Sequence, residues 1–76
     1  MNQQPHVAQP QPVFQVDPFV VQALRAVLGK KLVVETIRGS VSGDLRDVKP
    51  DHVVVQQADG KPVYVRISQI VWIMPV

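Results

Sequence analysis

The chain has 76 residues, which is room for one domain, and chains of this length bury only about 60% of the surface that they expose when unfolded. It contains no cysteine, which excludes disulfide bonds and thiolate metal sites and leaves oligomerisation as the remaining way to support a thin core. The formal net charge of +2 gives only a weak preference for anionic partners, and the apolar runs are far shorter than a membrane span. Because the sequence also starts without a secretion signal, we expect a cytoplasmic protein with no membrane segment.

Residues 1–16 are rich in glutamine and proline. This composition buries too little apolar surface to offset the entropy lost on ordering, so we expect a disordered tail. The end of the tail is different, because Val13, Phe14 and Val16 are apolar and could dock on the folded domain or on a neighbouring subunit. For Phe14 we favour contact with the helix that follows. A single folded domain is predicted over residues 17–76.

A short helix is predicted over residues 18–28. The side chain of Asp17 can accept hydrogen bonds from the first turn, and Pro18 suits the first helical position because it loses no hydrogen bond there. Gly29 supplies the left-handed residue that commonly ends a helix. The apolar residues that recur at helical spacing predict one buried face, formed by Val20, Leu24, Val27 and Leu28.

After the helix the apolar pattern changes to a period of two, which is typical of β-strands. Five strands are predicted, at residues 32–38, 40–46, 52–57, 63–68 and 70–74. The dipeptide Asp59-Gly60 predicts a hairpin, and Gly43 at an inward position predicts a sharp bend or a close approach of two backbones. Five short strands after one helix predict a mostly β fold, in which a strongly bent antiparallel sheet closes into a small barrel.

The last two strands are the predicted site of self-association. The alternation of Ile70, Trp72 and Met74 predicts that these residues face the core, whereas an outward-facing Trp72 would be a natural anchor of a subunit interface. The end strands of so small a barrel often remain partly unpaired, and an open apolar edge is a template for a second chain. The residues predicted at such an interface are Tyr64, Ile70, Trp72 and Ile73.

The order of these elements, and two short motifs, resemble the Sm-like family. The run Gly39, Val41, Gly43, Leu45, Val48 resembles the first Sm motif, and the segment from Val65 to Ile70 resembles the second. The resemblance implies an Sm-like or SH3-like small barrel that assembles into rings through the fourth strand of one subunit and the fifth strand of the next. It also implies an RNA-binding set, which in this sequence is Lys49, His52, Arg66 and Gln69.

Three positions depart from the Sm pattern. Lys49 and His52 stand where that family has an acidic residue and an asparagine, and Ile67 stands where it has a glycine that admits the base. Only half of the RNA pocket is therefore expected. Taken as a whole, residues 35–75 are similar to the YuzF-like family of short, uncharacterised proteins from Bacillus-type spore formers. This resemblance is closer than the Sm-like one, and it implies no established activity.

No group of residues predicts an enzyme, a cofactor or a metal site. Asp51 beside His52 is interpreted as a turn aspartate and a strand-entry histidine, because no serine or cysteine has a spacing that completes a catalytic set. Tyr64 and Arg66 share one face of their strand and could contribute to a basic and aromatic strip that binds single-stranded nucleic acid. Cross-strand salt bridges are the favoured alternative, and they would join Arg38 or Arg46 to Glu35 or Asp44.

Two hypotheses on function follow from these patterns. The leading one is a non-enzymatic, self-associating structural or interaction module, with a place in sporulation implied by the resemblance. The alternative is an RNA-binding Sm-like ring, and a hydrolase is a distant third.

Overall fold

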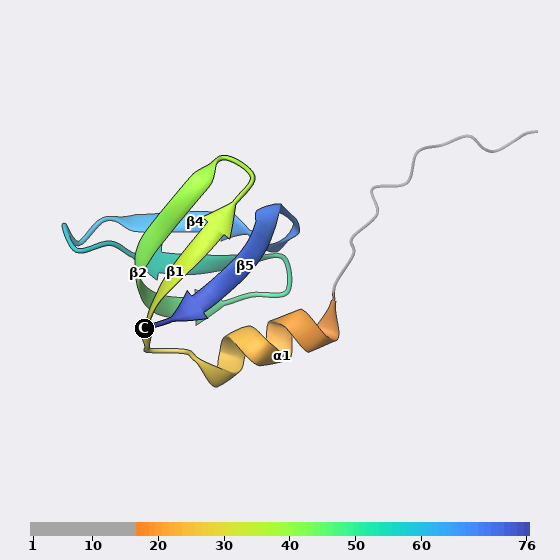
Figure 1. Cartoon of the computed structure of the whole chain (residues 1–76). Coiled ribbons are helices and arrows are strands. Elements are labelled where there is room, and N and C mark those ends of the chain that lie inside the picture. Colours follow the sequence, from red (N-terminus) through yellow and green to blue (C-terminus); the bar gives the residue numbers. More distant parts are fainter. Residues whose placement is uncertain (1–16) are drawn as a thin grey trace, which may run out of the picture.

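The structure is a computed structural model that describes residues 17–76 (Figure 1). Its elements in chain order are α1 (Pro18–Ala26), β1 (Lys31–Thr36), β2 (Gly39–Val48), β3 (His52–Gln56), β4 (Pro62–Arg66), the 3₁₀ turn η1 (Ile67–Gln69) and β5 (Ile70–Pro75). The expectations for residues 1–16, including the apolar end of the tail, lie outside the described residues. No helix within residues 17–76 is long and apolar enough to cross a bilayer.

Helix α1 begins where the sequence predicts. The Asp17 carboxylate accepts hydrogen bonds from the backbone N–H groups of Phe19, at 3.0 Å, and Val20, at 3.3 Å, so the predicted N-cap is confirmed. The helix ends two residues earlier than predicted, because its last turn tightens into bonds between residues three apart. Gly29, with a φ of 84°, then turns the chain out of the helix.

The buried face of α1 differs from the predicted one. Leu24 is fully buried as expected, but the second buried residue is Val21, while Val20 and Leu28 are exposed. The buried residues have a spacing of three along the helix, and Val27 packs against the core as the next member of this row. Val20 and Leu28 lie at the flank of the buried face.

The five strands form one antiparallel sheet in the order β4-β3-β2-β1-β5. The mostly β class and the antiparallel sheet are confirmed, but the sheet does not close into the predicted barrel. Strands β4 and β5 are consecutive in sequence, yet they occupy the two edges of the sheet (Figure 1). The turn η1 carries the chain from one edge to the other without bringing the two strands into hydrogen-bonding register.

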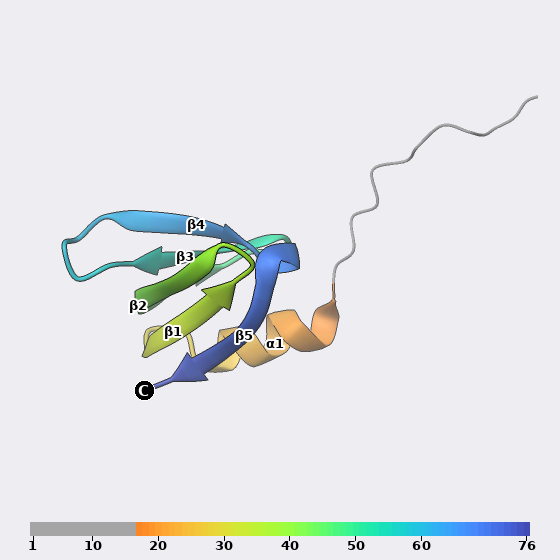
Figure 2. The ribbon, with the colours of Figure 1, turned by 45° about the horizontal axis from the view of Figure 1, so that its top comes forward.

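Strand β2 belongs to both halves of the sheet and bends between them. Its pairing with β3 shifts register between Leu45 and Asp47, which is a bulge that strengthens the local twist. As a result β3 and β4 run at an angle to β1 and β5 (Figure 2). The close approach predicted at Gly43 is confirmed, because a Cβ atom added there would lie 2.2 Å from the carbonyl oxygen of Gln56.

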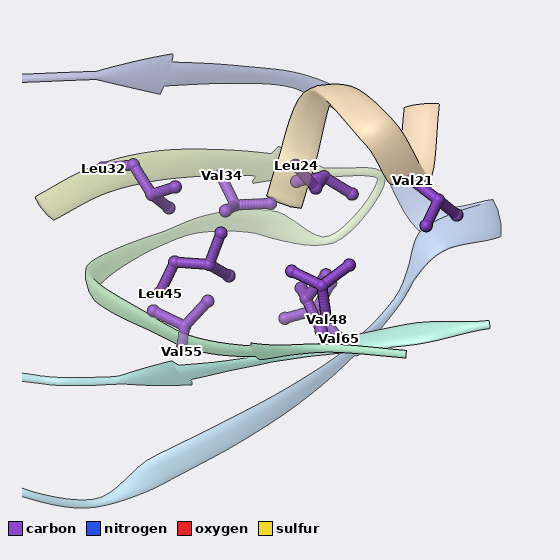
Figure 3. Packing of buried hydrophobic residues seen from close by; sticks show 9 residues of the cluster. Val21, Leu24, Leu32, Val34, Leu45, Val48, Val55 and Val65 are labelled. Atoms are coloured by element: carbon purple, nitrogen blue, oxygen red, sulfur yellow. The ribbon is translucent and has the colours of Figure 1, made fainter. Parts of the chain in front are cut away.

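The core lies between the two halves of the bent sheet, and α1 covers one side of it (Figure 3). Nine apolar residues form it: Val21, Leu24, Leu32, Val34, Leu45, Val48, Val53, Val55 and Val65. The strand members follow the period-two pattern, with one exception. Leu45 and Val48 are three residues apart and both buried, because the bulge between them inserts an extra residue.

The turn η1 replaces the end of the predicted fourth strand, so Ser68 lies in a 3₁₀ turn rather than in β4. Both ends of this turn are tied to other parts of the sheet. The N–H of Ile67 donates to the carbonyl of Asp51 at 2.9 Å, and the carbonyl of Gln69 accepts from Ile37 at 3.1 Å. The turn therefore fixes β4 and β5 relative to the β2–β3 and β1–β2 loops.

The predicted alternation of β5 is wrong. Ile70 and Ile73 pack against the core, whereas Trp72 and Met74 are 45% and 49% exposed. The cause is a bulge: Thr36 lies opposite Ile70 and the preceding β1 residue lies opposite Trp72, so Val71 has no partner in β1. The extra residue moves the rest of the strand to the opposite face.

Candidate functional site

The pairing of β4 with β3 determines which backbone groups of β4 point toward the free edge of the sheet. Hydrogen bonds from Gln57 N–H to Lys61 O and from Ile67 N–H to Asp51 O lie at the two ends of this pairing. In an antiparallel ladder, residues that bond to the neighbouring strand alternate with residues whose backbone groups point away from it. The N–H and C=O of Tyr64 therefore point to the outside of the sheet, where no strand of residues 17–76 lies beside β4.

The free edge of β5 follows from the same alternation. The N–H of Val76 donates to the carbonyl of Lys31 at 3.1 Å, so residues at even positions near this end of β5 bond to β1. The backbone groups of Ile73 consequently point outward. Pro75 and, on β4, Pro62 also occupy outward positions, where the missing N–H breaks no bond within the sheet.

An apolar groove, here called the α1–β5 groove, runs beside the free edge of β5. Its volume is about 380 Å³. It is lined by Asp17, Val20, Ala23, Leu24, Ile67, Ser68, Ile70, Val71, Trp72 and Ile73. Three of the four predicted interface residues are among these, and the fourth, Tyr64, is 67% exposed on the opposite edge strand. The structure thus distributes the predicted interface over both edges of the sheet.

A polar cluster lies on the outer face of β3 and β4. It consists of Asp51, His52, Tyr64 and Arg66, around an open hollow of about 250 Å³. His52 lies directly opposite Arg66 in the strand register, and its Nδ1 atom is 2.7 Å from Oδ1 of Asp51. The centres of the His52 and Tyr64 rings are 6.1 Å apart. The predicted common face of Tyr64 and Arg66 is confirmed.

The charge of this cluster is mixed. The hydrogen bond with His52 is the main reason that the pKa of Asp51 lies below its ordinary value, and the positive charge of Arg66 acts in the same direction. Asp51 is therefore ionised at neutral pH. Its carboxylate partly cancels the positive charge that would attract a phosphate group.

The residues predicted to bind RNA do not all meet at this cluster. His52 and Arg66 do, whereas Lys49 lies in the preceding turn with its ammonium group 3.5 Å from the Asp47 carboxylate. Gln69 is the last residue of η1, whereas β4 ends directly before the first residue of η1. The sequence analysis does not place Asp51 in an RNA-binding set, although Asp51 is next to His52 in the sequence.

The predicted cross-strand salt bridges are wrong. Arg46 donates from Nε to Oε1 of Gln56 at 2.6 Å, and the Glu35 carboxylate accepts a hydrogen bond from the Ser40 hydroxyl. Arg46 occupies the β2 bulge, which directs its side chain toward β3 instead of β1. In residues 17–76 the side chains form no group of three or more metal-binding residues.

Comparison with known proteins gives a family but no activity. The family described as "Domain of unknown function (DUF2642)" matches residues 11–75. The chain is also 38% identical over 66 residues to the uncharacterized protein YuzF of Bacillus subtilis (strain 168), an alignment that covers 87% of this chain and 85% of that protein.

Proposed function

Because the chain belongs to the family described as "Domain of unknown function (DUF2642)", we propose its function from the structure: it is a non-enzymatic module that associates with copies of itself. The proposed contact is the pairing of β4 of one copy with β5 of the next, which is an Sm-like arrangement. The observation that carries this proposal is the order β4-β3-β2-β1-β5, which leaves an outward-facing backbone at each end of one sheet. Free strand edges of this kind readily form backbone hydrogen bonds with a strand of another chain.

The two edges are compatible in register. An antiparallel alignment that sets Tyr64 opposite Ile73 of the next copy also sets Pro62 opposite Pro75, because both pairs are two residues apart. The Tyr64 and Ile73 pair can exchange two backbone hydrogen bonds. Proline has no backbone N–H, so the two opposed prolines leave no donor unpaired. They mark the end of the ladder.

Exposed apolar side chains accompany these edges. Tyr64 is 67% exposed on β4, and Val71 and Trp72 are 61% and 45% exposed on β5. Aromatic residues of this kind are enriched at the buried centres of protein interfaces. Association would bury apolar area that a chain of 76 residues cannot bury alone, which is the support expected for a small core without disulfides.

Light scattering after size exclusion tests the proposal. We expect the wild-type protein at micromolar concentration to have a mass that is a multiple of its 8.5 kDa chain. The variant Tyr64→Pro removes an outward N–H without breaking a bond to β3, so it should shift the protein toward the monomer. The matched control is Tyr64→Thr, which loses the ring but keeps the N–H and should remain more associated than the proline variant. A monomeric wild-type protein would refute self-association, and equal masses for the two variants would refute pairing through the β4 backbone.

The alternative function, RNA binding, is favoured by one observation, the meeting of His52, Tyr64 and Arg66 at one hollow. A ring and a guanidinium could hold a base and a phosphate there. The test is a titration with oligo-U and oligo-A at two salt concentrations, because binding through a cation must weaken as salt rises. If RNA is the ligand, Arg66→Gln reduces the affinity and the salt slope, and absence of binding at low salt removes this alternative.

A further inference from the structure

The α1–β5 groove is an apolar hollow that residues 17–76 leave open, with a volume of about 380 Å³. Its walls are the flank of α1 and the outer side of η1 and β5, and Asp17 is its one ionisable lining residue. Val71 and Trp72 remain 61% and 45% exposed beside it. An open apolar groove of this kind marks a site that another apolar group covers. The volume of about 380 Å³ corresponds to roughly a dozen water molecules, which is space for side chains rather than for one bound water.

We propose that the occupant of the groove is the segment of this same chain that precedes Asp17, with Phe14 as the side chain that enters it. The segment contains three apolar residues, Val13, Phe14 and Val16, within four positions of Asp17. Phe14 is the largest of them. A phenylalanine ring buries about 150 to 250 Å² and needs no hydrogen-bond partner, which suits a groove lined mainly by valine, leucine and isoleucine.

The position of Asp17 brings this segment to the groove. Asp17 lines one end of the groove and is held there by its two hydrogen bonds to the first turn of α1. Three residues of extended chain span at most about 10 Å, so Phe14 stays within reach of the groove in every conformation of the intervening residues. A short tether of this kind gives an effective concentration in the millimolar range, far above that of a second copy at micromolar concentration.

The extent of the family match supports the same segment. The match begins at residue 11, six residues before Asp17, so the family domain includes Val13, Phe14 and Val16. The matched range therefore extends beyond the first residue of α1. Val7, by contrast, lies outside the match. The inference does not rest on the proposed self-association, since it concerns a contact within one chain.

Paired cysteines in the full-length protein test this contact, because the natural sequence has none. One variant combines Phe14→Cys with Ala23→Cys, which lines the groove, and the control combines Phe14→Cys with Gln22→Cys, which is exposed on α1 outside the groove. The two partner positions are adjacent in sequence, so their tethers have nearly the same length. In a glutathione buffer we expect the effective concentration for the intrachain disulfide to be at least about tenfold higher for the Ala23 pair. Equal values for both pairs, or disulfides that join two chains, would overturn the proposal.

Trp72 gives a second measurement, because it is the single tryptophan and it lines the groove. In Phe14→Ser, the emission of Trp72 should shift to longer wavelength and quenching by acrylamide should increase. Val7→Ser is the matched control and should leave both unchanged. The mass of each variant is measured in parallel by light scattering, which separates loss of the intrachain contact from loss of assembly. Unchanged emission and quenching in Phe14→Ser, at unchanged mass, would contradict docking of Phe14.

Discussion

The two edges of the sheet have opposite chemical character. At the β4 edge the exposed face carries the polar cluster, with Arg66 opposite His52 and the Asp51 carboxylate beside them. At the β5 edge the exposed residues include Val71, Trp72 and Met74, and Val71 and Trp72 line the apolar α1–β5 groove. Both edges present an outward backbone, so the difference lies in the side chains.

This difference indicates which edge leaves more apolar surface exposed to water. Charged side chains remain hydrated in water, so the β4 edge leaves little apolar surface exposed when it has no partner. The β5 edge has no charged residue between Ile70 and Pro75, and part of its apolar surface remains open. We therefore expect changes at the β5 edge to affect association more than changes at the β4 edge.

The largest effect is expected where the two halves of the sheet are joined. Gly43→Ala places a Cβ atom 2.2 Å from the carbonyl oxygen of Gln56, a backbone atom that cannot move away without separating β2 from β3. The free energy of unfolding should fall by about 3 kcal/mol or more, as measured by urea denaturation. Ser42→Ala, at the neighbouring exposed position, is the control and should change it by about 0.5 kcal/mol or less. A normal stability for Gly43→Ala would contradict the packing described for β2.

A smaller effect, measured on association, is expected from Val71→Lys. A lysine on the free edge of β5 would have to lose water when a second strand pairs there, which costs several kcal/mol for an unpaired charge. The dissociation constant of the assembly should rise by at least about tenfold. Leu28→Lys adds the same charge at an apolar residue that is exposed but outside the groove, and it should leave association unchanged. If both variants associate equally, the β5 edge is not the contact.

The smallest effect is a shift in the pKa of Asp51 at the polar edge. This pKa is lowered, mainly by the hydrogen bond with His52, so the contact stabilises the fold above the ordinary value of 3.8 and is lost as the pH falls through the lowered pKa. In His52→Ala the pKa of Asp51 should rise toward 3.8, as followed by the carboxyl carbon shift in an NMR titration. The carboxylate is highly exposed, so the stability at neutral pH should change little. An unchanged pKa in His52→Ala would assign the shift to Arg66 or to the backbone.

The two edges also differ in how well the sequence predicts them. In β4 the strict alternation of Val63, Tyr64, Val65 and Arg66 predicts inward and outward residues correctly, because the pairing with β3 has no bulge. In β5 the same rule fails, because the continuous apolar run contains no polar residue to mark the position where the register shifts. The bulge at Val71 decides which residues are exposed, and it depends on the pairing with a strand more than 30 residues earlier in the chain.

The sequence predicts the structure correctly where a single residue determines the local conformation of the backbone. Asp17, Gly43 and the Asp59-Gly60 turn each act within a few residues or through the absence of a side chain, and all three predictions are confirmed. The meeting of Asp51, His52 and Arg66 depends on the register of β3 with β4, which sequence spacing alone does not specify. The same is true of the α1–β5 groove, since its two walls come from opposite ends of the domain.

The turn η1 has a consequence for the geometry of any assembly. It is only three residues long and is tied to the rest of the fold at both ends, so the direction of β4 is fixed relative to that of β5. If copies join edge to edge, each is rotated from the last by the same angle, and this single angle decides whether the series closes into a ring or continues as a helical filament. The number of subunits would then depend on the angle between β4 and β5, which this 3₁₀ turn helps to fix together with the three strands between them.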